Sequence, residues 1–299
     1  MAHAKDRDSQ FEFGDFTDGT YMERDFFICH PEALRFCLYC DDFEVANPIG
    51  SHKKKHKLTI MYWSLLNIEP EFRFKLQCTQ LLAVAKTSDI KKFGFEPLLK
   101  DFVSSMKKLH GGYELMIDGK SELFYGTLLC VVGDTPAAQM LGGFKEGVGF
   151  AEKPCRTCEI SRDDLSRSEA LTFPLRSELE HRDRCENLSS LSRASQQYWS
   201  KKYGVVSASF LLDIPDFTVT KCILHDPMHV LLEGIVKMEL QLLLEHFIDK
   251  QKYFTLKDMN RVILNFDYGP DRMQDKPQPL ERKSLDRKHV FPMTAVETL

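Results

Sequence analysis

Hydrophobic residues in the first half of the chain gather in short runs separated by polar turns, a pattern typical of β-strands. Two further runs, at 113–117 and 123–132, flank Asp118-Gly119, a dipeptide favoured in two-residue hairpin turns. The sequence therefore predicts a hairpin there, preceded by three strands of aromatic and β-branched residues. These three are predicted at 34–40, 58–66 and 74–85.

Elsewhere hydrophobic positions recur every three or four residues, which is the period of a helix. Between residues 93 and 109 they include Leu99, Phe102 and Met106. Thr135-Pro136 is typical of a helix start, and a long helix is predicted over residues 226–249. Strands interspersed with helices predict an α/β (α+β) fold, in which a mixed sheet is flanked by helices.

The character of the chain changes along its length, which divides it into five segments. We expect an N-terminal arm, the first part of a core, an insertion dominated by Gly, Ser, Arg and acidic residues, the final core helices, and a basic tail that has been cut short. The segments are 1–30, 31–141, 142–220, 221–265 and 266–299.

Composition places the chain among ordinary globular proteins. Of 299 residues, 43% are hydrophobic and 28% charged, with a net charge of −4, which argues against disorder and against a strongly basic nucleic-acid binder. The polar start lacks a signal-peptide pattern, and no apolar run approaches the roughly 20 residues that span a bilayer. We therefore expect a soluble protein, made in the cytosol and without a membrane partner, whose nine cysteines are reduced.

Acidic residues stand at the ends of two predicted strands. Asp41 and Asp42 follow the first strand, and Asp134 follows the last. Sites in α/β sheets lie at the carboxyl ends of strands, and carboxylate ligands suit Mg²⁺ or Mn²⁺. Glu233, near the start of the long helix, would complete a cluster for two-metal phosphodiester chemistry. An aspartate in this position is also common as a turn residue or helix cap.

Cysteine and histidine form a second group of candidate ligands. Cys155 and Cys158 have the C-x-x-C spacing of half a tetrahedral zinc site. The alternative is a surface dithiol without a metal. Two pairs have the spacing to complete a zinc site: His181 with Cys185 in the same segment, or Asp226 with His229 at the start of the long helix.

A basic segment separates the first two predicted strands. Lysines in such a segment bind DNA phosphates electrostatically, and a run of this kind also serves as a nuclear address. A solvated, charged hairpin is the alternative interpretation. The lysines concerned are Lys53, Lys54, Lys55 and Lys57.

Four strings of the sequence, each modest alone, are specific when taken in order. They are LYCDDFEVANPIG at 38–50, followed by the basic segment; GDTPA at 133–137; LGGFKE at 141–146, followed by the C-x-x-C; and HDPMHVLLEG at 225–234. In order and spacing they resemble the first catalytic motif, the second catalytic aspartate, the cysteine knuckle and the D-x-x-H segment of CACTA (En/Spm-like) DDE transposases and their animal relatives. The resemblance covers about residues 15–250.

The resemblance implies an RNase H-like fold, interrupted before its last catalytic helix by an insertion with a zinc knuckle. It implies three carboxylates that hold Mg²⁺ or Mn²⁺, cut DNA and join transposon ends to a target. Asp41 corresponds to the first acid, although the adjacent Asp42 leaves the register open, and Asp134 corresponds to the second. The third is Glu233, with Glu239 and Glu245 as rivals further along the helix.

Two functions therefore compete. In the first, the chain is a nuclear DDE-type transposase domain that performs metal-dependent DNA cleavage and strand transfer, acting alone or as a homo-oligomer. In the second, it is a domesticated or decayed transposase whose zinc knuckle and sheet survive as a scaffold that binds DNA or protein. The intact acids favour the first function. The lack of a separate DNA-binding motif favours the second.

Overall fold

The short hydrophobic runs in the first half of the chain form strands, most of which join one sheet. The last helices of the chain form a separate unit. The computed structural model describes residues 14–44, 57–166, 172–269 and 276–285. The chain divides after Leu224 into a first unit, residues 1–224, and a second unit, residues 225–299, and each is described by itself.

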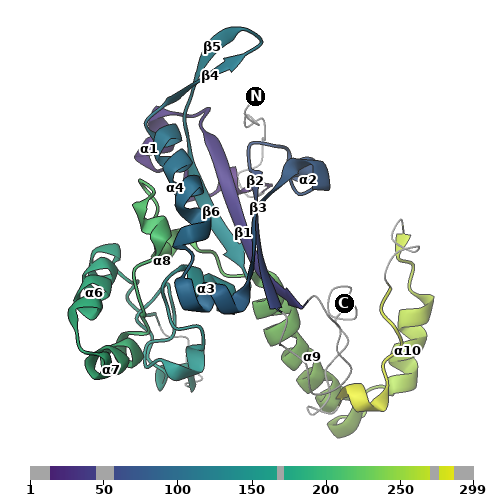
Figure 1. The fold of residues 1–299 in the computed structure, drawn as a ribbon. Coiled ribbons are helices and arrows are strands. Elements are labelled where there is room, and N and C mark those ends of the chain that lie inside the picture. Colours follow the sequence, from purple (N-terminus) through teal and green to yellow (C-terminus); the bar gives the residue numbers. More distant parts are fainter. Residues whose placement is uncertain (1–13, 45–56, 167–171, 270–275, 286–299) are drawn as a thin grey trace. The chain divides into compact units, whose positions relative to one another are not determined.

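A mixed four-stranded sheet forms the centre of the first unit (Figure 1). Its order is β3-β2-β1-β6, with β1 antiparallel to β2, β2 antiparallel to β3, and β1 parallel to β6. On the other side of β6, Ile223 forms a parallel bridge with Val131. The strands are β1 (Leu34–Glu44), β2 (Lys57–Leu65), β3 (Thr79–Lys86) and β6 (Gly126–Gly133). The predicted mixed sheet is thus confirmed.

The strands predicted at 34–40 and 58–66 are confirmed, but the first is longer than predicted. Asp41 and Asp42 lie inside β1 because they pair with Ile60 and Thr59 of β2. The third predicted strand begins too early: residues Leu76–Cys78 form a 3-10 turn before β3 starts.

Helices cover both faces of this sheet. On one face, Leu99, Phe102 and Met106 of α4 pack in one core with Leu38 of β1 and Val131 of β6. On the other face, the phenylalanines of α1 pack against the start of β1 and the middle of β6. Each buried side chain of this size stabilises the fold by about 1.5–3 kcal/mol. The helices are α1 (Asp25–Cys29), α2 (Pro70–Arg73), α3 (Thr87–Phe93), α4 (Glu96–His110) and α5 (Thr135–Leu141). The helix start at Thr135 is confirmed.

The predicted hairpin turn is confirmed, but the strand predicted after it is in fact two strands. Asp118 and Gly119 have φ values of 50° and 80°, the left-handed conformation that a type I′ turn requires. β4 (Tyr113–Ile117) pairs with β5 (Lys120–Phe124) in a hairpin that projects from the first unit (Figure 1). The chain then crosses into the main sheet at Gly126, where a Cβ atom would lie 3.0 Å from that of Leu34.

Residues 142–220, expected to be an insertion, contribute to the main core. Their helices are α6 (Glu178–Ser190), α7 (Arg193–Tyr203) and α8 (Val219–Cys222). Phe144, Val205, Leu211 and Phe217 are almost fully buried in the cluster that also contains the α4 side chains. The segment is rich in polar residues, yet part of its apolar side chains joins the core beside the sheet.

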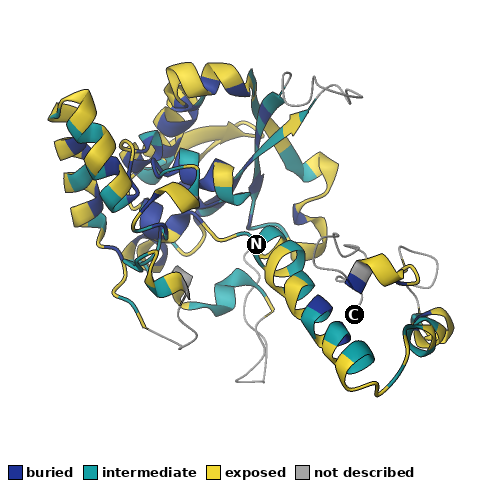
Figure 2. Ribbon diagram, turned by 90° about the horizontal axis from the view of Figure 1, so that it is seen from below, coloured by how far each residue is buried: buried dark blue, intermediate teal, exposed yellow. Residues whose placement is uncertain are grey.

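The second unit is helical. One continuous helix runs from Met228 to Lys250, as predicted, with α9 (Val236–Leu244) at its centre and wider π turns on either side. It is followed by α10 (Leu256–Asn265), whose start is fixed by a reciprocal pair of hydrogen bonds between Thr255 and Asp258. A small core holds these pieces together, and Figure 2 marks its buried positions in dark blue.

None of the described helices has the length and apolar character that crossing a membrane requires.

Candidate functional site

Two of the predicted acids come together at one edge of the sheet. β1 and β6 are parallel, and Cys40 lies opposite Gly133. Asp41 and Asp134 are the next residues along the two strands, so they stand side by side at the carboxyl ends of the paired segments. Such an edge is where α/β proteins place their sites.

Gly133 allows the two strands to approach closely at this point. A Cβ atom on Gly133 would lie 2.6 Å from the carbonyl oxygen of Cys40, which is too short for any real contact. Immediately afterwards, Asp134 caps α5, because its Oδ1 accepts a 2.8 Å hydrogen bond from the N–H of Ala137. The capping role that an aspartate after a strand commonly has is therefore present, and it fixes the Asp134 carboxylate at the helix N-terminus.

Asp41 and Asp42 differ in their surroundings because successive side chains of a strand point to opposite faces. Asp42 lies opposite Thr59, whose hydroxyl donates a 2.5 Å hydrogen bond to it, and the Lys57 ammonium is 3.8 Å away. Asp41 is on the other face, where it accepts a 3.3 Å hydrogen bond from the hydroxyl of Tyr39. The adjacent acids thus have separate partners on separate faces.

The pKa of the buried Cys40 thiol is raised, and the nearby carboxylates contribute to this shift. Burial raises the pKa of Cys40 to about 12, and the carboxylates of Asp42, Asp41 and Asp134 add to the effect in that order. The burial of Tyr39, together with the adjacent Asp41, raises the pKa of its phenol well above the usual value. Both groups therefore stay protonated near neutral pH, and Tyr39 keeps the proton that it donates.

The remaining predicted acids belong to the second unit. At its start, His229 Nδ1 hydrogen-bonds Asp226, and His229 Nε2 lies 3.9 Å from Glu233 one turn further on. The pKa of Asp226 is lowered: burial acts against this, but the bonds with His229 and the N–H of Met228 outweigh it. Of the rivals, Glu239 is exposed and Glu245 pairs with Lys250 at 3.4 Å.

The C-x-x-C forms a tight turn in the first unit. Cys155 Sγ accepts hydrogen bonds from the N–H groups of Thr157 and Cys158, at 3.3 and 3.4 Å. Two buried arginines hold the turn. Arg156 donates to the carbonyls of Ile223 and Leu224, while Arg176 donates to those of Lys153, Cys155 and Tyr203. The turn is therefore shaped by contacts with backbone carbonyls of distant segments.

His181 and Cys185 lie one turn apart on α6, with 3.5 Å between Nε2 and Sγ. Both are buried, and His181 also packs against the ring of Phe144. Within the described ranges, no three His, Cys, Asp or Glu side chains lie close enough together to hold a metal ion. In the first unit, therefore, the pair Cys155 and Cys158 does not form one cluster with His181 and Cys185.

The buried imidazole of His181 makes the first unit sensitive to acid. Burial, followed by the nearby Arg176, lowers the pKa of His181 to about 4, so between pH 6.5 and 4 the unfolded chain binds a proton that the folded chain does not. Stability should be constant above pH 6.5 and fall by about 3 kcal/mol as the pH is lowered to 4. Urea unfolding at several pH values, with chelator present, measures this loss. His181→Gln should flatten the dependence, and an unchanged slope in that variant would contradict the assignment.

Most of the predicted DNA-binding lysines lie outside the described residues, namely Lys53, Lys54 and Lys55. Lys57 is described: it is the first residue of β2 and sits near Asp42. Because the other three lysines are not described, the proposed phosphate-binding role of this segment stays a prediction.

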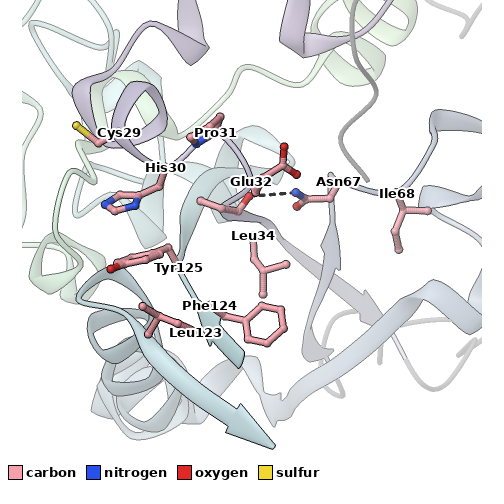
Figure 3. Close-up of a pocket in the computed structure, with 11 residues that line it drawn as sticks. Cys29, His30, Pro31, Glu32, Leu34, Asn67, Ile68, Leu123, Phe124 and Tyr125 are labelled. Atoms are coloured by element: carbon pink, nitrogen blue, oxygen red, sulfur yellow. Dashed lines mark hydrogen bonds between the residues drawn. The ribbon is translucent and has the colours of Figure 1, made fainter. Parts of the chain in front are cut away.

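The cavity shown in Figure 3 is separate from the acidic edge. It has a volume of about 640 Å³ and is lined by the end of α1, the start of β1 and the base of the β4–β5 hairpin. His30 stacks on Tyr125 there, with 3.8 Å between ring centroids. Leu34 lines it, whereas Asp41 is seven residues along the same strand, or about 23 Å. None of the residues singled out from the sequence lines this cavity.

Sequence reasoning missed the residues that hold the candidate groups in place. Tyr39 supports Asp41, Thr59 supports Asp42, and Arg156 and Arg176 support the C-x-x-C turn. Tyr39 could have been found, since residues i and i+2 of a strand share a face. The arginines could not, because their partners are carbonyls far away in the sequence.

Comparison with models of known protein families gives no match for this chain, and comparison with curated proteins gives none either.

Proposed function

We propose that this chain contains the RNase H-like catalytic core of a CACTA-like DDE transposase and cuts DNA with the help of a divalent metal. The observation that carries the proposal is the pair Asp41 and Asp134, each the next residue after the last paired positions, Cys40 and Gly133, of two parallel strands. The strand order β3-β2-β1-β6, with β2 antiparallel to both neighbours, supports an RNase H-like sheet.

The residues of this edge fit a hard divalent cation. Mg²⁺ is typically held by one or two carboxylates, with water and substrate phosphate supplying the other ligands. Asp41 and Asp134 supply two carboxylates on neighbouring parallel strands. Bound there, Mg²⁺ or Mn²⁺ would activate an attacking oxygen and stabilise the leaving one.

Of the two adjacent acids, we assign the first catalytic role to Asp41. Tyr39 on the same face lies opposite Val132, which is two residues before Asp134. Asp42 faces the other way and is already occupied by Thr59 and Lys57. Its part is therefore to pair β1 with β2 rather than to bind metal.

The third acid is assigned to Glu233, in the second unit. His229 lies between Asp226 and Glu233 and would orient the glutamate through its Nε2. Glu239 is exposed and Glu245 is paired with Lys250, which makes them weaker candidates. Transposon ends and target DNA would be the partners, and the nucleus the place of action.

Metal binding tests this proposal directly. Mn²⁺ is titrated calorimetrically into the full chain with a generic DNA duplex present, because bound phosphate completes such sites. The natural chain should bind Mn²⁺ saturably, and Asp134→Asn, which removes one ligand with little change of shape, should lose the binding and any DNA cleavage.

Asp42→Asn is the matched control, since it alters the neighbouring acid on the opposite face. It should keep Mn²⁺ binding, while circular dichroism confirms that all three proteins are folded. Equal binding by the natural chain and Asp134→Asn, or no binding by either, would overturn the catalytic assignment.

A non-catalytic scaffold is the second candidate function. It is favoured by the structural roles that two of the acids already fill: Asp134 caps α5, and Asp42 binds Thr59 and lies near Lys57. In this case the Cys155–Cys158 turn, with or without zinc, and the sheet would present a surface to nuclear DNA or protein. Zinc content of the purified chain, compared with Cys155→Ser, would test whether the turn holds a metal.

A further inference from the structure

We infer that Tyr39 is the positioning residue that orients the Asp41 carboxylate toward the metal. This inference rests on the proposed function. The Tyr39 hydroxyl donates to Asp41 Oδ2 at 3.3 Å, and the N–H of Asp42 donates to Asp41 Oδ1 at 2.7 Å. One donor on each oxygen fixes the plane of the carboxylate. An ionised carboxylate offers about four lone-pair sites, so both oxygens still have capacity for a cation.

The ring of Tyr39 is itself held in place. Tyr39 lies opposite Tyr62 in the β1–β2 register, and the two rings stack with 4.6 Å between centroids and 21° between planes. Cross-strand aromatic pairs of this kind stabilise a sheet. The stack holds the ring, and with it the hydroxyl oxygen, beside Asp41, so the donor of this hydrogen bond is preorganised.

The adjacent Asp42 also accepts a hydrogen bond from a side-chain hydroxyl, but this donor is a threonine on the neighbouring strand. Its donor is Thr59, which also shares a 3.0 Å hydrogen bond with Thr87 at the start of α3. This second chain of contacts ties β1 to β2 and α3. The Tyr39 and Thr59 hydroxyls support different acids on different faces. Removing one hydroxyl at a time therefore shows which of the two acids binds metal and which one only stabilises the sheet.

Supports of ligating side chains typically change metal affinity 10–100-fold when removed. Tyr39→Phe deletes the hydroxyl and keeps the ring and its stack on Tyr62. Since the hydrogen bond is long, we expect the lower end of that range: an increase of about tenfold in the Kd for Mn²⁺. Cleavage should be restored at saturating Mn²⁺, because the ligand itself is still present.

The experiment compares Mn²⁺ titrations of the natural chain, Tyr39→Phe, Thr59→Val and Asp134→Asn, with a generic duplex present and the thermal midpoint of each protein recorded. The expected result is weaker binding in Tyr39→Phe, unchanged binding in Thr59→Val and none in Asp134→Asn. A purely structural role for Tyr39 would lower the thermal midpoint without changing the Kd, and this result would overturn the inference.

Two further outcomes distinguish the failure of this inference from failure of the proposed function. If Asp134→Asn abolishes binding while Tyr39→Phe binds normally, or if Thr59→Val weakens binding instead, only the role of Tyr39 is wrong. If Asp134→Asn binds Mn²⁺ as the natural chain does, the metal site itself is wrong, and the role of Tyr39 is overturned with it.

Discussion

Gly143→Ala is expected to lower the free energy of unfolding of the first unit by about 4 kcal/mol or more, the range seen only for severe disruptions. Gly143 has a φ of +74°, and a Cβ atom there would lie 1.9 Å from the carbonyl oxygen of Ser207. Its own carbonyl accepts a 2.7 Å hydrogen bond from Val206. Relief of the clash would separate these segments, breaking this bond and exposing the buried Val205.

Urea unfolding followed by tryptophan fluorescence measures this effect, because both tryptophans, Trp63 and Trp199, belong to the first unit. Gly94→Ala is the control: Gly94 has nearly the same φ, +76°, but nothing lies within 4 Å of its added Cβ. It should lose only about 1–2 kcal/mol, the cost of the left-handed conformation. Similar losses in the two variants would show that the close approach at Gly143 has no energetic weight.

Arg176→Met is expected to lower the free energy of unfolding of the first unit by about 3–5 kcal/mol, because three carbonyls lose a buried donor at about 1–3 kcal/mol each. Glu159 keeps Lys153 and Arg184 as partners, so the loss comes from these carbonyls. The Arg176 side chain is 1% exposed, and its Nη1 lies 3.6 Å from Glu159. It donates hydrogen bonds of 2.7–2.9 Å to the carbonyls of Lys153, Cys155 and Tyr203. Methionine fills similar space but satisfies none of these acceptors, so three carbonyls would be left without this donor.

The same fluorescence measurement applies, with Lys91→Met as the matched control. Lys91 pairs with Glu146 at 3.1 Å, but both side chains are about half exposed, and such pairs contribute about 0–1 kcal/mol. Arg176→Lys should fall between, since an ammonium lacks the fork of a guanidinium. If Arg176→Met is as stable as Lys91→Met, the arginine is not what fixes the C-x-x-C turn.

Local features of the fold were predicted where local chemistry decides them. The short aromatic and β-branched run at 58–66 predicted β2, Asp118-Gly119 predicted the hairpin turn, and the three-to-four-residue period predicted α4. The limits of a strand could not be predicted where they depend on contacts with residues far away in the sequence. The run 123–132 was divided because Gly126 packs against Leu34, about ninety positions away in the sequence, and nothing local in the run shows that contact.

The candidate site shows the same division. Its aspartates were identified from their position after apolar strands, but their proximity depends on the parallel pairing of β1 with β6. The choice between Asp41 and Asp42 depends on strand register, because a shift of one residue exchanges the two faces. The cysteine and histidine spacings left two completions of a zinc site open, and only the fold shows that one of these pairs, His181 and Cys185, is buried in the first unit.

The sequence by itself determined the types and approximate limits of the main strands and helices and the residues able to carry metal chemistry, because periodicity and side-chain chemistry are local properties. The tertiary structure alone decided which acids meet, which face of β1 each one occupies, and which buried side chains hold the C-x-x-C turn. Those features arise from backbone pairing and carbonyl contacts between segments far apart in the chain, and neither leaves a pattern in the residues on either side.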